Sequence, residues 1–385
     1  ANSTFAGNFG NSNILVDSGA TLTTDFATVL NGKVNVLSGT GNVTLTDTNV
    51  DASDVNDVAG KISGVVTATI TDGAVTDTLN AITNVETTDL ITFTTTDTSA
   101  DASDIVALNE KVDNFTVTSI NTITENAATI GTSASTVTQA LTITGGTEAV
   151  VITGAISAAN TNTIATATSG VVTATITNGA VSSTLAAITA VDVNDVITFT
   201  TTDSSVDASD LVDLAAKVDT FTTTSVNTIT EAYNTVALTT EITDALEIVP
   251  NAAVTVTGGS ITTTNANTID GLTTGVVTAS ISETDASTLA TVTDANGNND
   301  YTATITTASV DASVFNGISN VIANLTDGGV TTLTETAADF AEVNTALTGG
   351  VLNGNEAVTI TGDITAVNVS TILNNTSGVV TATIS

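Results

Sequence analysis

The sequence predicts a mainly β repeat solenoid: a right-handed parallel stack of about 14 coils of 22–30 residues, several of them carrying a short helix. An irregular parallel β-helix is the alternative fold. Two observations support this prediction. Short landmarks recur about every 105 residues, and a strand-like pattern recurs four times within each such interval.

The long repeat is read from the motif GVVTA. It occurs four times, at intervals of 106, 105 and 103 residues, beginning at Gly64, Gly170, Gly275 and Gly378. DLITFTTTD (Asp89–Asp97) keeps the same period and returns as DVITFTTTD (Asp195–Asp203). One continuous array is therefore expected: a partial repeat unit of about two coils at 1–63, units at 64–169, 170–274 and 275–377, and the first strand of a further unit at 378–385.

Each coil is expected to begin with a strand. In VTATI the apolar Val66, Ala68 and Ile70 alternate with Thr67 and Thr69, the pattern of a strand with one buried face. Successive strands should pair in parallel through right-handed crossovers. No single coil can bury its own faces, so stability should come from stacking on neighbours.

A helix is expected after several strands. In DASDLVDLAAKVDT, Leu211, Leu214 and Val218 form a helical stripe, and Asp207 occupies the N-cap position. The same arrangement recurs at Asp51–Ile62 and Asp101–Val112. The helical pattern is weaker in two later segments, Asn160–Gly170 and Asn265–Gly275.

Tandem segments of the form VTxTI, DASxLxxL and TITETAAD, poor in basic residues and cysteine, carry a family resemblance. The chain resembles the large repetitive surface proteins of marine bacteria and cyanobacteria, which include S-layer-like proteins and type I-secreted adhesins. The resemblance implies an extracellular protein at the cell surface, with cell-surface polysaccharide as a candidate partner. The GGxGxD nonapeptide of calcium-binding secreted repeats is absent from the sequence.

Composition excludes several classes of function. Four Lys, no Arg and 40 acidic residues give a formal net charge of −36, so the chain lacks the clustered cations that nucleic-acid binding requires. No apolar run reaches the ~18 residues of a membrane span. Without Cys or His, the usual zinc, haem and iron–sulfur sites have no ligands, and no cofactor is expected apart from Ca²⁺.

Calcium is the candidate ion because three segments each place three carboxylates within eight residues. The candidate ligands are Asp47, Asp51, Asp54, Asp97, Asp101, Asp104, Asp203, Asp207 and Asp210. Helix capping is the competing interpretation, because a helix N-terminus favours anions over cations.

A ladder of threonines is the candidate binding surface. It comprises Thr67, Thr69, Thr92, Thr94, Thr122, Thr124, Thr173, Thr175, Thr198, Thr200, Thr228, Thr230, Thr255 and Thr257. Stacked in two files on one face, these residues would resemble the ice-binding faces of some antifreeze proteins. The competing interpretation is that threonine simply suits any exposed strand face.

These patterns predict a structural extracellular protein, a solenoid rod that forms a surface layer, filament or adhesin stalk through end-to-end stacking or as part of a longer array, with self-association expected. The alternative is an ice-binding or ligand-binding adhesin module that uses the threonine ladder. Enzymatic activity is not expected, because every acidic cluster is a repeat feature, whereas a catalytic site is normally unique. The candidate inter-subunit strand comprises Gly378, Val379, Val380, Thr381, Ala382, Thr383 and Ile384, since an open stack exposes an unpaired strand edge.

Overall fold

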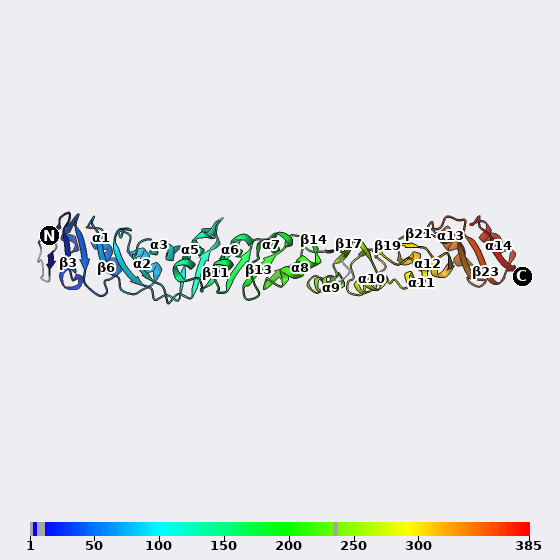
Figure 1. Cartoon of the computed structure of the whole chain (residues 1–385), viewed down its shortest axis with the longest axis horizontal. Coiled ribbons are helices and arrows are strands. Elements are labelled where there is room, and N and C mark those ends of the chain that lie inside the picture. The colour runs from blue at the N-terminus through cyan, green and yellow to red at the C-terminus, as the bar shows by residue number, and fades with distance from the viewer. Residues whose placement is uncertain (1–2, 6–11, 132, 234–237) are drawn as a thin grey trace. The chain divides into compact units, whose positions relative to one another are not determined.

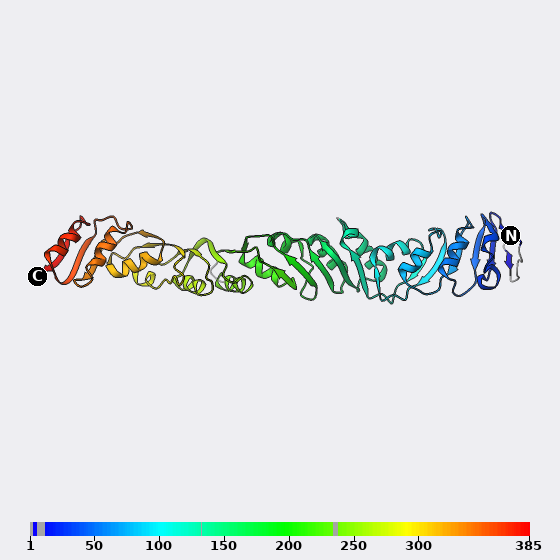
Figure 2. The ribbon, with the colours of Figure 1, turned by 180° about the vertical axis from the view of Figure 1, so that it is seen from behind.

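Short strands and helices follow one another along the described chain, with two strands in succession at several places (Figure 1). The computed structural model describes residues 3–5, 12–131, 133–233 and 238–385. Figure 2 shows the same succession of elements from behind.

The predicted mainly β repeat solenoid, and the irregular β-helix that was its alternative, are wrong. The described residues form an α/β fold that is about 32% helical, with 14 α-helices and five parallel sheets. The strands do not form one continuous ladder; they divide among separate sheets. Helix also replaces the loops expected in some of the connecting segments.

Four larger sheets and one small sheet contain the strands, and within each larger sheet neighbouring strands are hydrogen-bonded in the order of naming. The first contains β1 (Ser3–Phe5), β3 (Thr21–Thr24), β5 (Asn42–Leu45), β6 (Val66–Thr69), β7 (Leu90–Thr94) and β9 (Asn114–Thr116). The second contains β8 (Ser99–Asp101), β10 (Thr122–Asn126), β11 (Ala149–Ile156), β12 (Val172–Ile176), β13 (Val196–Thr200) and β15 (Thr220–Thr222).

The third sheet contains β14 (Ser205–Asp207), β16 (Thr228–Ala232), β17 (Ala253–Ile261), β18 (Val277–Ile281), β19 (Asp300–Ile305) and β21 (Asn324–Asp327). The fourth contains β20 (Ser309–Asp311), β22 (Thr332–Thr336), β23 (Ala357–Ile364) and β24 (Val380–Ile384). The small sheet pairs β2 (Ile14–Val16) with β4 (Leu37–Gly39).

Helices fill the connections between the strands. They are α1 (Ala52–Ala59), α2 (Val75–Ala81), α3 (Ala102–Asn109), α4 (Ala127–Ile130), α5 (Ser135–Thr144), α6 (Ala158–Ala167), α7 (Val181–Ala187), α8 (Ala208–Ala215), α9 (Leu238–Ile248), α10 (Thr263–Asp270), α11 (Ala286–Leu289), α12 (Ala312–Val321), α13 (Ala341–Thr348) and α14 (Ala366–Leu373). A π-helical segment, η1 (Phe26–Leu30), and a 3₁₀ turn, η2 (Val34–Val36), lie near the N-terminus.

The chain passes from one sheet to the next at three equivalent places. Strand β8 lies between β7 and β9 in the sequence, yet β7 pairs with β9 while β8 pairs with β10. Strands β14 and β20 start the next two sheets in the same way. These starting strands begin at Ser99, Ser205 and Ser309, 106 and 104 residues apart. The period of the sheets is therefore close to the period of the sequence landmarks.

The core lies between the strands and their helices. Val66, Ala68 and Ile70 of the first GVVTATI segment are 0%, 4% and 1% exposed, so the predicted inward face is confirmed. The predicted stripe of α8 is confirmed as well, since Leu211 and Leu214 are fully buried.

Two segments with a weak helical pattern form helices all the same. The Ser157 hydroxyl accepts the Asn160 N–H at 3.1 Å and caps α6, and the Thr262 hydroxyl caps α10 in the same way. Ile164 anchors α6 in the core. The buried apolar side chain and the side-chain cap together outweigh the low helix propensity of threonine and asparagine.

Contacts between residues divide the chain into two compact units, each with its own sheets. Ala1–Asn178, Ala186–Thr200 and Lys217–Phe221 make up the first; Gly179–Leu185, Thr201–Ala216 and Thr222–Ser385 make up the second. Within the described residues, no helix has both the length and the apolar character needed to cross a membrane.

Candidate functional site

Strand β24 has one paired side and one open side. It pairs in parallel with β23 from Val380 to Ile384, and no described strand pairs with its other side. The apolar side chains of Val379, Ile384 and Leu373 are 72%, 59% and 52% exposed. Leu373 lies in α14, the helix that packs against β24. Figure 2 shows this region in red. We call the open side of β24, with Ile384 and Leu373, the β24 edge.

Three internal strands with the same motif show how such an edge is covered. Strands β6, β12 and β18 each pair on the equivalent side with a further strand, β7, β13 and β19 respectively. There the residues equivalent to Ile384 are nearly fully buried, at 1%, 1% and 6% exposed: Ile70, Ile176 and Ile281. Burial of an isoleucine stabilises by about 2 kcal/mol, so each covering strand contributes substantially to the stability of its joint.

The glycine of the GVVTA motif permits a close approach of two chain segments. A Cβ atom built on Gly170 would lie 2.3 Å from the Glu148 carbonyl oxygen, and one on Gly378 would lie 2.2 Å from the Glu356 carbonyl oxygen. The preceding threonine reinforces the contact, since the Thr168 hydroxyl donates to that same Glu148 oxygen at 2.6 Å. Only glycine fits here, which explains the repeated SG and TG dipeptides.

A polar side chain ahead of each covering strand binds the motif strand. Its Oδ1 atom accepts the N–H of the first valine of the motif strand: Asp89 from Val66 at 2.7 Å, Asp195 from Val172 at 2.8 Å, and Asn299 from Val277 at 2.8 Å. Further along the first of these strands, the Ile70 N–H donates to the Thr92 carbonyl at 2.9 Å. In β24 the equivalent donors are Val380 and Ile384, whose N–H groups lie on the open side.

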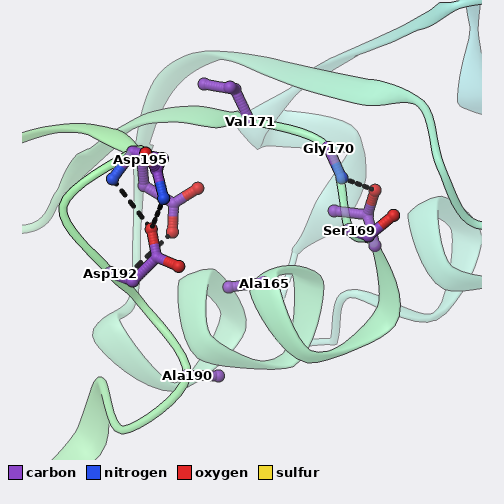
Figure 3. A pocket seen from close by; sticks show the side chains of 9 residues that line it. Ala165, Ser169, Gly170, Val171, Ala190, Asp192 and Asp195 are labelled. Carbon is purple, nitrogen blue, oxygen red and sulfur yellow. Dashed lines mark hydrogen bonds between the residues drawn. The ribbon is translucent and has the colours of Figure 1, made fainter.

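A cavity of about 350 Å³ lies at the second of these joints, and Figure 3 shows its lining. Ala165 lies at the floor, Ser169 and Gly170 on one side, and Asp192 and Asp195 on the other. Both carboxylates are bound to backbone: Asp192 Oδ1 accepts the Asn194 N–H at 2.8 Å, and Asp195 Oδ2 accepts the Asp192 N–H at 3.2 Å. These contacts hold the loop before β13 in place.

The third repeat fills the equivalent space with a buried polar network. Asp270 replaces Ala165, and its carboxylate accepts from the Asn299 amide at 2.7 Å and the Thr293 hydroxyl at 2.9 Å. The Asn299 amide also lies 3.2 Å from the Tyr301 hydroxyl. Burial, then the charge of Asp270, raises the pKa of the Tyr301 phenol. Asparagine in place of Asp195 avoids two carboxylates in one buried space.

The acidic residues proposed as calcium ligands lie at helix N-termini. Asp97 Oδ2 accepts the first N–H of α2, from Val75, at 2.7 Å, so it caps the helix of the preceding segment. Asp203 does the same for α7, and Asp47 accepts the first N–H of η1. Asp101 and Asp207 cap their own helices by accepting from the serine two residues on.

The remaining candidates have smaller roles. Asp104 Oδ2 accepts the Thr76 hydroxyl at 2.5 Å, whereas Asp51 precedes α1 without a capping side-chain bond. Burial is the main cause that raises the pKa of Asp54, and the charge of Asp51 raises it further. The pKa of Asp210 is raised in the same way by burial and then by the charge of Asp207. Within the described ranges, no three acidic side chains converge as a metal site would need. Calcium binding stays a prediction.

Sequence reasoning missed a second acceptor at these caps. Glu125 Oε2 accepts the Ser103 N–H at 3.1 Å, and Glu231 and Glu335 do the same for Ser209 and Ser313. Each glutamate is buried and lies in the second strand after the capped helix. Burial, followed by Asp207, raises the pKa of Glu231. The recurring TITE motif was the available signal for this contact.

The threonine ladder is interrupted. Thr69, not Thr67, pairs with Thr92, and Thr67 pairs with Leu90, so the files shift by two residues between β6 and β7. Thr92 and Thr122 belong to different sheets. Most of the ladder threonines are half-buried, while Thr175 and Thr257 are exposed. Instead of two continuous files, each sheet carries short threonine rows of its own.

Comparison with protein-family models finds no match to this chain, and comparison with curated proteins finds none either.

Proposed function

We propose that the chain is a structural component of an extracellular surface layer, filament or adhesin stalk, in which repeat units associate through the β24 edge. The observation that carries this proposal is one joint built three times, in which the motif strands β6, β12 and β18 are each covered by a parallel strand, β7, β13 and β19 respectively. Strand β24 carries the same motif, and a strand edge is a template for pairing with another strand.

Composition supports the extracellular location that we propose. The chain has no Cys and carries a net charge of −36, which keeps the surface soluble while the apolar faces are buried. In the described part of the chain, most carboxylates of the DASD segments bond to backbone N–H groups or hydroxyls, which favours a structural role for them.

Sedimentation velocity over a wide concentration range tests the proposal. The full chain should associate as its concentration rises, and Ile384→Lys should suppress association because a lysine on an edge strand opposes further pairing. Val193→Lys is the matched control, since Val193 is 80% exposed and belongs to the loop before β13. A chain that stays monomeric throughout, or an Ile384→Lys variant that associates like the parent, would contradict the proposal.

A further inference from the structure

We infer that the carboxylates of Asp207 and Glu231 form a proton-sensitive pair, which binds one proton from solvent in mild acid and then holds the start of the third sheet more tightly than at neutral pH. This property belongs to the fold and does not depend on association of the chain, so it goes beyond the proposed function. The inference stands on the way in which the two side chains meet.

The two carboxylates share one backbone donor. Asp207 Oδ1 accepts the Ser209 N–H at 3.2 Å, and Glu231 Oε2 accepts the same N–H at 3.3 Å. Glu231 is 5% exposed, so water screens its charge only weakly. Two carboxylates this close repel each other when both are ionised, whereas one proton bound between them replaces the repulsion with a hydrogen bond.

The same arrangement recurs wherever the chain starts a new sheet. Asp101, Asp207 and Asp311 end the starting strands β8, β14 and β20, and the partner glutamates lie in the strands that pair with these, β10, β16 and β22. In the first and third copies, the Ser103 and Ser313 N–H groups each lie 3.1 Å from their glutamate. Three copies with nearly the same distances make the carboxylate pair a feature of the repeat.

Further acidic groups surround the second copy. Helix α8 brings Asp210 and Asp213, and the first turn of α9 brings Glu241. Asp244 and Glu247 lie further along α9. Strand β17, which pairs with β16, carries no titratable residue. The groups that face the pair from these elements therefore add negative charge to it.

The positive charge closest to the pair in sequence lies beyond the other end of α8. Lys217 follows this helix, and its ammonium group donates to the Val191 carbonyl at 2.9 Å. This lysine is thus held by a backbone oxygen instead of by the carboxylates at the start of α8. Protonation is the route by which the pair loses its repulsion.

The titration of the second copy agrees with its geometry. Burial, then the charges of Asp207 and Glu241, raises the pKa of Glu231 above its ordinary value of 4.5. A group whose pKa is raised by folding binds its proton more tightly in the folded state than in the unfolded chain. The resulting stability is present below pH 4.5 and is lost as the pH rises through the raised pKa of Glu231.

Thermal unfolding of the full chain between about pH 7.5 and about pH 4.5 tests the inference. Glu231→Gln places a neutral side chain of the same shape in the pair, with an amide that donates to Asp207 as the bound proton would. At the higher pH, we expect the midpoint temperature of this variant to exceed that of the parent by about 2 °C. At the lower pH the difference should disappear, because the parent is then protonated.

Two variants serve as controls. Glu247→Gln removes an equal charge from an exposed position on α9, so it reports the effect of net charge alone. Glu125→Gln tests the first copy, where Glu125 Oε1 also accepts the Asn126 N–H at 2.7 Å and the Thr129 hydroxyl, and where α5 carries no acidic residue. The charged form of Glu125 has more donors and fewer acidic neighbours, so this variant should give no gain at the higher pH.

Three results would overturn the inference: a Glu231→Gln variant no more stable than the parent at the higher pH, a difference that does not change with pH, or an equal gain from Glu247→Gln. Carbon NMR of the Glu231 carboxyl in the folded parent chain gives a readout that needs no variant. Its titration midpoint should lie above pH 4.5, and a midpoint at or below that value would refute the inference. None of these results depends on association, so the proposed function is tested separately.

Discussion

At the scale of single residues, one type of contact recurs throughout the chain: a short polar side chain accepts a backbone N–H from a segment about 22 residues away. Asp97 reaches Val75 in this way, and Asp195 reaches Val172. In the third repeat the hydroxyl of Thr307 takes the place of the aspartate and accepts the Ala286 N–H at 2.8 Å. Such contacts satisfy helix and strand ends that would otherwise stay unpaired.

The caps of α8 and α1 provide a matched test of this contact. Asp207 Oδ1 accepts from Ser209 and Asp210, whereas Asp51, at the equivalent position, makes no capping bond. Asp207→Ala should lower the free energy of unfolding by about 1 kcal/mol, the usual cost of losing an N-cap. Asp51→Ala should leave it nearly unchanged. Urea unfolding of both variants measures the difference, and equal losses would refute the capping role.

At the scale of elements, the sequence predicted those features that have a local signal. Alternating Val66, Ala68 and Ile70 predicted a strand, and the stripe of α8 predicted a helix. The three-residue strand β8 carries too short a pattern to be recognised, so its exchange of partners between sheets could not be foreseen. Helix α6 was underestimated because its stability comes from packing and capping.

The motif glycine sets the spacing between elements, and its replacement tests that role. Gly170→Ala would place a methyl group 2.3 Å from the Glu148 carbonyl oxygen, in a contact that the backbone cannot relieve locally. We expect a loss of about 3 kcal/mol in the free energy of unfolding. Gly317→Ala in α12 is the control: its Cβ would meet no atom within 4 Å, and alanine should stabilise the helix by about 0.5–1 kcal/mol. The midpoint temperature of thermal unfolding should therefore fall for Gly170→Ala and rise for Gly317→Ala.

At the scale of the whole molecule, the long repeat of the sequence corresponds to the passage from one parallel sheet to the next. The strand at Val380–Ile384 could be predicted from the sequence, because its motif repeats that of β6, β12 and β18. The side-chain contact that joins each internal motif strand to the segment covering it could not be predicted. It joins residues 23 positions apart, such as Asp89 and Val66. In the sequence this aspartate recurs with the same period as the helix-capping aspartates, so the pattern alone does not separate the two roles.

Amide hydrogen exchange tests most directly the claim that β24 presents an open, strand-accepting edge. At low protein concentration, the amides of Val380, Ala382 and Ile384 should exchange much faster than those of the equivalent Val172, Ala174 and Ile176, which lie between two strands. Raising the protein concentration should slow exchange in β24 and leave β12 unchanged. Protection in β24 equal to that in β12 at low concentration, or exchange in β24 that stays fast at every concentration, would contradict the account.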